Sequence, residues 1–197
     1  AAVIPILIDV IYFAFTSGEF QIGCHSMDDL IDILIHEVFS SGFRAAVTEG
    51  MLFRGLMSAA VQKGFGYKAG ILVSSFFYAA VSFIFYNGFV WSGPYCFWKF
   101  LLTFLIGMAL ILITCETGSV WASVVIHFLY NALSGDAYIL HISTRQDFPA
   151  VFTYTVKGKD AFFAEMSLPA AAVFSAVIIM EAVTLKKRGM LWEKQID

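Results

Sequence analysis

Long apolar stretches separated by short polar links run through most of this chain. Crossing a bilayer takes about 20 apolar residues in a helix, because hydrocarbon cannot satisfy open backbone groups. The pattern therefore predicts an all-α fold: a polytopic transmembrane helical bundle of about six membrane helices, formed as a single membrane domain over residues 1–197. The segments that reach or approach the required length are 1–16, 28–63, 67–89, 97–115, 118–133 and 168–185.

Composition supports this class and argues against others. Of the 197 residues, 59% are hydrophobic and 14% are charged, whereas soluble domains carry roughly 25% charged residues. The sequence has no stripe of basic residues that would indicate a nucleic-acid partner. The expected surroundings are membrane lipids. The apolar start, which lacks a basic region, predicts no removable signal peptide. The cysteines have no CxxC or metal-ligand spacing, and we interpret them as small apolar side chains; they are Cys24, Cys96 and Cys115.

Basic residues predict how the helices are oriented. The positive-inside rule places the cluster 186–188, which follows the last apolar segment, in the cytoplasm. Successive links alternate between the two sides of the membrane. Counting back from this cluster, the polar loop 134–167 is extracytoplasmic and the turn 63–68, with its two lysines, is cytoplasmic. Because the two basic clusters agree independently, we predict an integral protein of the cell membrane with a cytoplasmic C-terminus and an extracytoplasmic loop over residues 134–167.

An ionisable group deep in a membrane helix costs several kcal/mol and is a functional candidate by default, and five polar side chains in three of the predicted helices are the candidates for a site. Glu49 and Ser82 each lie 14 residues from the nearer lysine of the turn 63–68, which is about 21 Å along a helix. Asn131 is predicted at a similar depth, with His127 one turn nearer the cytoplasm. This shared depth predicts a polar intramembrane chamber. The five candidates are Glu49, Arg54, Ser82, His127 and Asn131.

Spacing within each helix refines the prediction. His127 and Asn131 are four residues apart, so they should lie on one face and address one site. Glu49 and Arg54 are five residues apart, which is roughly 140° around an α-helix. We therefore expect Arg54 to reach another helix or the cytoplasmic interface, and Glu49 to meet a different partner.

Each of these residues also has a purely structural interpretation. Glu49 alone could bond across the bundle, His127 could be a structural hydrogen-bonding group, and Ser82 could bond to the carbonyl at i−4. Asp9 and Glu181, single acidic residues near helix ends, are interpreted as snorkelling or locally paired. The shared depth of the candidates favours a site over these separate roles.

Three ordered motifs occupy the candidate positions. They read TEGMLFRG at 48–55, SSFFYAAVS at 74–82, and HFLYN at 127–131 after TGSVWA at 117–122. Over about residues 43–134, the family core, the chain resembles the CPBP (Abi, CAAX-protease-like) family of intramembrane peptidases, whose motifs are EExxxR, FxxxH and HxxxN or HxxxD. Tyr78 stands at the Phe position of the second motif.

The resemblance implies a role for each candidate. Glu49 would be the general base that activates a water molecule. His127 and Asn131 would orient that water and polarise the scissile carbonyl, with Arg54 and Ser82 as supporting residues.

Two positions depart from the family pattern. Gly50 stands where the family has its second glutamate, and Ser82 where it has the histidine of the second motif. A serine hydroxyl cannot bind a proton near neutral pH, and losing a general acid or base slows a reaction about 10²–10⁴-fold.

We expect no cofactor, and zinc is disfavoured because Glu49, His127 and a serine form a thin ligand set. Ser82→His with Gly50→Glu should restore cleavage if the cavity has room for an imidazole.

Two functions are compatible with these residues. The preferred one is a degenerate peptidase site that binds a membrane protein, a peptide or a lipid-linked ligand with weak or no proteolysis. The alternative is an active intramembrane endopeptidase that uses Glu49 to activate water. A transporter or channel is disfavoured, because the sequence has no inverted repeat and no pair of helices broken by Gly or Pro.

Overall fold

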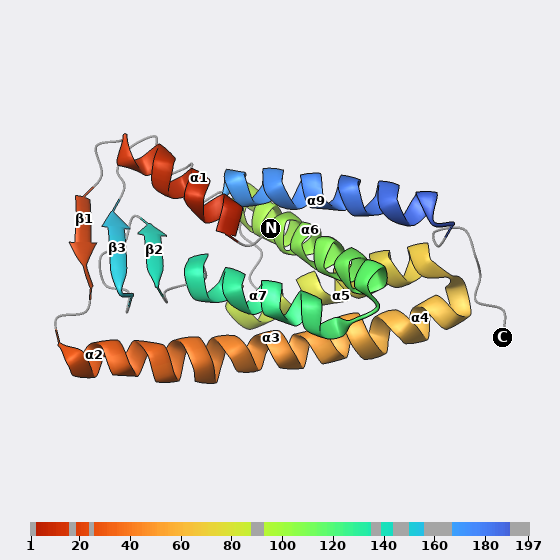
Figure 1. Cartoon of the computed structure of the whole chain (residues 1–197), viewed down its shortest axis with the longest axis horizontal. Helices are drawn as coiled ribbons and strands as arrows, with labels where there is room; N and C mark the ends of the chain where they lie inside the picture. Colours follow the sequence, from red (N-terminus) through yellow and green to blue (C-terminus); the bar gives the residue numbers. More distant parts are fainter. Residues whose placement is uncertain are drawn as a thin grey trace. The chain divides into compact units, whose positions relative to one another are not determined.

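The computed structural model describes residues 3–15, 19–23, 26–87, 93–134, 139–143, 150–155 and 167–189. The chain divides into two compact units, whose α-helices and strands are labelled in Figure 1. The first comprises Ala1–Ala46 and Val125–Ala170, and the second comprises Val47–Val124 and Ala171–Asp197. Cys24 and most of the loop 134–167 lie outside the described residues.

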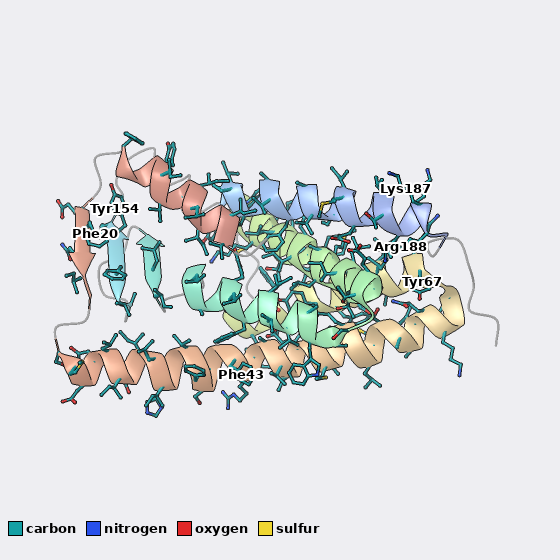
Figure 2. The ribbon with its side chains drawn as sticks, in the orientation of Figure 1. Phe20, Phe43, Tyr67, Tyr154, Lys187 and Arg188 are labelled. Carbon is teal, nitrogen blue, oxygen red and sulfur yellow. The ribbon has the colours of Figure 1, made fainter. Side chains whose placement is uncertain are left out.

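The first unit contains a small sheet that the sequence pattern does not predict. Besides the helix α1 (Val3–Ala14), it holds the strands β1 (Glu19–Ile22), β2 (Leu140–Ser143) and β3 (Phe152–Thr155). β3 lies in the middle, antiparallel to β1 and parallel to β2, and Phe20 and Tyr154 are register partners (Figure 2). Strands of four residues are too short to give a recognisable alternating pattern, and two of these lie within the predicted loop.

The segment predicted as a membrane helix at 28–63 is helical without a break from Met27 to Phe65. Ser26 caps it, because its hydroxyl accepts from the Asp29 backbone N–H while the Asp29 carboxylate accepts from the Ser26 N–H. Two stretches within this helix have π-helical rather than α-helical geometry, which changes the residues that share a face. In order, the elements are α2 (Met27–Asp32), η1 (Ile33–Phe43), α3 (Arg44–Glu49), η2 (Gly50–Met57) and α4 (Ser58–Phe65).

The second unit holds the long apolar helices. α5 (Tyr67–Asn87) packs against α6 (Gly93–Thr117), α4 and η2. The unit also includes the start of α7 (Val120–Ser134) and most of α9 (Leu168–Lys187). Its core contains Ile71, Ile111, Leu112 and Leu185.

Three of the described helices are long and apolar enough to cross a membrane: Tyr67–Phe85, Tyr95–Thr117 and Leu168–Lys187. Val3–Tyr12 and Val120–Leu133 are apolar but shorter. Each of the six predicted segments is helical over most of its length. The predicted helical membrane bundle is therefore confirmed.

Three helix ends meet at one end of the second unit. Nε2 of Gln62, in α4, donates to Sγ of Cys115, in α6, over 3.5 Å. Arg188, which follows α9, forms a 3.3 Å ion pair with Glu116 at the end of α6; Figure 2 labels Arg188 beside Lys187. These contacts gather the links 63–68, 116–117 and 186–188, all of which the topology prediction assigns to one side of the membrane.

Candidate functional site

Glu49 and Arg54 of the first motif interact through their charges. Glu49 is the last residue of α3, and Arg54 lies five residues later in η2. In a π-helix the hydrogen bonds run between residues five apart, so such residues stack on nearly the same face. The expectation that these two side chains diverge by about 140° was therefore wrong, because it assumed the geometry of an α-helix.

Tyr78 of α5 completes this cluster. Its ring lies against the Arg54 guanidinium, with Cζ of Arg54 5.0 Å from the ring centroid. The Tyr78 hydroxyl donates a hydrogen bond to the Glu49 carboxylate and accepts one from Arg54. Arg54 is 3% exposed and Tyr78 6% exposed, so water screens these interactions little. Arg54 does reach another helix, as predicted, and it does so in a cluster that includes Glu49.

Two further contacts fix the Tyr78 ring. Phe53 of η2 packs edge-on against it, with ring centroids 5.6 Å apart. On the α6 side, a Cβ added at Gly107 would lie 2.9 Å from Cδ1 of Tyr78, so only glycine permits this close approach. The ring is thus held between η2 and α6. We infer that its hydroxyl has little freedom to turn away from Glu49.

Tyr78 is a site residue that the sequence prediction missed. The signal was present, because Tyr78 occupies a position where the resembling family has Phe. The two side chains differ by one hydroxyl, and that hydroxyl makes the contacts to Glu49 and Arg54. Ser82 lies one helical turn later on the same helix and is half-buried, so the two residues share a face of α5.

The third motif lies in the part of α7 that belongs to the first unit. Nδ2 of Asn131 is 3.2 Å from Nε2 of His127, which confirms the prediction that the two side chains share one face. Because an amide nitrogen only donates, Nε2 accepts, and a neutral His127 carries its proton on Nδ1. His127 is 3% exposed. Next to it, Phe128 packs edge-on against Phe43 with centroids 5.5 Å apart.

The chamber that would join Glu49 and Ser82 to His127 and Asn131 stays a prediction, since the two pairs belong to different units. Over the part of the chain that the structure describes, no group of three or more His, Cys, Asp or Glu side chains could hold a metal ion.

Comparison with known families gives one match. The model of the type II CAAX prenyl endopeptidase Rce1-like family matches residues 32–133, just over half of the chain and inclusive of all three motifs. The chain belongs to the Rce1-like family. A search of curated proteins and a search of solved structures gave no match. The family resemblance predicted from the motifs is thus confirmed.

One departure from the family pattern is built into the packing of this Rce1-like chain. Gly50, which replaces the second glutamate, is buried. A Cβ added there would lie 2.5 Å from Cγ2 of Val124 in α7. Val124 is β-branched and therefore stiff at χ1, and it is 0% exposed. Position 50 consequently has no space for a side chain, and the predicted rescue by Gly50→Glu would need Val124 to move.

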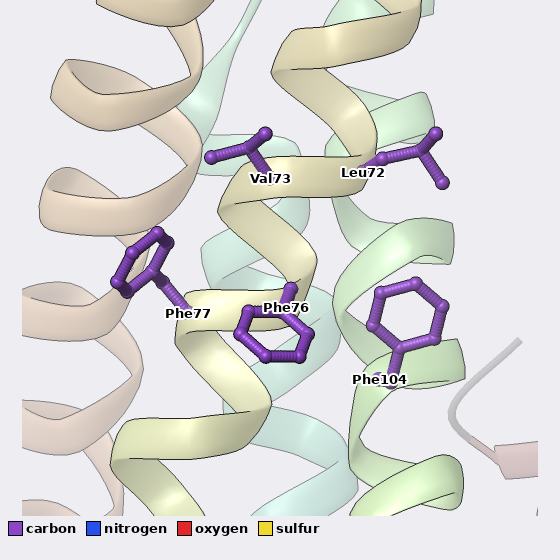
Figure 3. Close-up of a pocket in the computed structure, with 5 residues that line it drawn as sticks. All are labelled: Leu72, Val73, Phe76, Phe77 and Phe104. Atoms are coloured by element: carbon purple, nitrogen blue, oxygen red, sulfur yellow. The ribbon is translucent and has the colours of Figure 1, made fainter.

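An apolar groove of about 290 Å³ lies on α5 and α6 of the same unit (Figure 3). Its lining side chains are the kind that lipid tails solvate as readily as protein does. Its lining contains no group that could take up or release a proton and includes none of the five candidate residues. The lining residues are Leu72, Val73, Phe76, Phe77 and Phe104.

Proposed function

We propose that this Rce1-like protein binds a peptide or a lipid-linked ligand within the membrane at a degenerate peptidase site, and cleaves it slowly or not at all. The closure of position 50 carries this proposal. Val124 fills the space that a second carboxylate would need, and Ser82 supplies no imidazole. Two side chains of the family pattern are thus missing, and each loss of a proton-handling group slows catalysis by about 10²–10⁴-fold.

The state of Glu49 supports the same proposal. Glu49 accepts a hydrogen bond from Tyr78 and interacts with the charge of Arg54. These contacts hold the carboxylate in place, and its remaining lone pairs can accept hydrogen bonds from N–H groups of a bound peptide.

The ligand class follows from the family and from the membrane setting. The family description names prenyl endopeptidases, so a prenylated peptide is the first ligand to test.

We further propose that the protein lies in the cell membrane with its C-terminus in the cytoplasm. The gathering of the links 63–68, 116–117 and 186–188 at one end of the second unit supports placing them on one side of the membrane, and their basic residues favour the cytoplasm for that side.

An active intramembrane endopeptidase is the second candidate. The observation that favours it is that Glu49, His127 and Asn131 are all retained, with His127 and Asn131 in contact. In that function Glu49 activates water, and Asn131 or His127 stabilises the oxyanion.

One experiment separates the two candidates. The full chain is reconstituted in lipid vesicles with a prenylated peptide that carries a photo-crosslinking group, and mass spectrometry reads both crosslinks and cleavage products. We expect crosslinks within the three motifs, competed by unlabelled prenylated peptide and not by its unprenylated form, with little or no product. Absence of competed crosslinks refutes the binding function, and rapid cleavage that Glu49→Gln abolishes supports the endopeptidase.

A further inference from the structure

Arg54 is a buried cation that requires a balancing negative charge. Its guanidinium stays protonated in proteins, and an unpaired buried charge is strongly unfavourable. The groups that interact with it electrostatically are Tyr78 and Glu49. A carboxyl group is a far stronger acid than a phenol. Glu49 is therefore the group that carries the balancing charge.

The Tyr78 hydroxyl lies between this anion and this cation. It donates to the Glu49 carboxylate and accepts from Arg54, so both neighbours polarise the O–H bond in the same direction. Hydrogen bonds to ionised groups are roughly twice as strong as neutral ones, and a buried chain of them strengthens each member. Phe53 and Gly107 hold the ring in place, so the hydroxyl has a defined direction.

We infer that Tyr78 is a positioning residue for Glu49: its hydroxyl keeps the Glu49 carboxylate in one orientation beside Arg54 and favours the ionised over the neutral form of that carboxylate. Phenylalanine, the residue of the family pattern, could stack on Arg54 but could not make either hydrogen bond. Position 82 lacks the imidazole of the family pattern, and Tyr78 places a phenolic hydroxyl one turn earlier on this face of α5. The inference rests on the proposed function, since it concerns how the same site presents Glu49 to a ligand.

Carbodiimide labelling tests this without any ligand. Dicyclohexylcarbodiimide enters the bilayer and reacts with carboxyl groups only when they are protonated. Its rate of reaction at Glu49, resolved by mass spectrometry of the full chain in vesicles, therefore reports the neutral fraction of that side chain. Glu181 of α9, which is 7% exposed, provides an internal reference carboxyl in the same sample.

Tyr78→Phe removes the hydroxyl and keeps the ring. Because a hydrogen bond to a charged group is lost, we expect the labelling rate of Glu49 relative to Glu181 to rise about tenfold. Tyr67→Phe, on the same helix, is the matched control and should leave the ratio unchanged. Gly107→Ala is a second variant, since its Cβ would displace the Tyr78 ring while keeping the hydroxyl. Gly107→Ala should also raise the labelling rate of Glu49 relative to Glu181.

The outcomes are distinct. An unchanged ratio in Tyr78→Phe, or an equal rise in Tyr67→Phe, overturns the inference. If the ratio rises in Tyr78→Phe while its unfolding midpoint stays close to that of the wild type, the rise reflects the lost positioning of Glu49 and not a general loss of structure. If the labelling ratio rises as expected but no competed crosslinks form, only the proposed function is overturned. If competed crosslinks form but the labelling ratio does not change, only the role of Tyr78 is overturned.

Discussion

Gly50→Ala is the smallest change that tests whether position 50 is closed. Its Cβ would lie 2.5 Å from Cγ2 of Val124, whereas carbon atoms pack best at about 3.5–4.0 Å. Overpacking of a stiff, fully buried neighbour costs about 1–3 kcal/mol, and the better helix propensity of alanine offsets up to about 1 kcal/mol of it. We expect a net loss of about 1–2 kcal/mol, which for a chain of this size lowers the unfolding midpoint by about 2–8 °C.

Gly55→Ala provides a matched control in the same π-helical stretch. A Cβ there would lie 3.6 Å from Cγ2 of Val120, an ordinary contact, so this change should leave the midpoint unaltered or raise it slightly. Thermal unfolding of both variants in the same mild detergent gives the comparison. In a Val124→Ala background the cost of Gly50→Ala should largely disappear, because the obstructing methyl group is gone.

A Gly50→Ala midpoint at or above that of Gly55→Ala would refute this reasoning. Position 50 would then have free space, and packing against Val124 could not explain why the second glutamate is missing. A cost that persists unchanged in the Val124→Ala background would likewise show that Val124 is not the obstacle.

Three further predictions concern charged residues. Arg54→Lys should lower the unfolding midpoint more than Arg44→Lys at an exposed position of the same helix, because lysine lacks the planar guanidinium that stacks on an aromatic ring; equal midpoints contradict this. Arg188→Ala should cost less than about 1 kcal/mol, since its ion pair with Glu116 is partly exposed, and a larger loss in the same assay would show that the pair is structural. A cysteine at Lys187, in a chain without other cysteines, should react with a membrane-impermeant maleimide only from the cytoplasmic side; reaction from outside would reverse the topology.

The membrane helices were predictable because the bilayer imposes a length on them. Segments such as 67–89 and 168–185 stand out through uninterrupted apolar composition, which needs no knowledge of tertiary contacts. The three-stranded sheet was not predictable in this way. Its strands have four residues each, and β3 pairs with a strand more than a hundred positions earlier in the chain.

The site shows a similar division between pattern and geometry. His127 and Asn131 follow α-helical spacing, and their contact was foreseen. Glu49 and Arg54 were misjudged because the chain between them is π-helical, a rare geometry that composition does not reveal. Tyr78 was overlooked because one added hydroxyl resembles a conservative change until its buried charged neighbours are known.

The most direct test of the proposed function is a cleavage assay on the reconstituted chain with a prenylated peptide, comparing the wild type with Glu49→Gln. We expect the wild type to bind the peptide and to release product at a rate indistinguishable from that of Glu49→Gln, or slower than a family member with complete motifs by at least about 10²-fold. Product release by the wild type at an ordinary enzymatic rate, abolished by Glu49→Gln, would contradict the degenerate site.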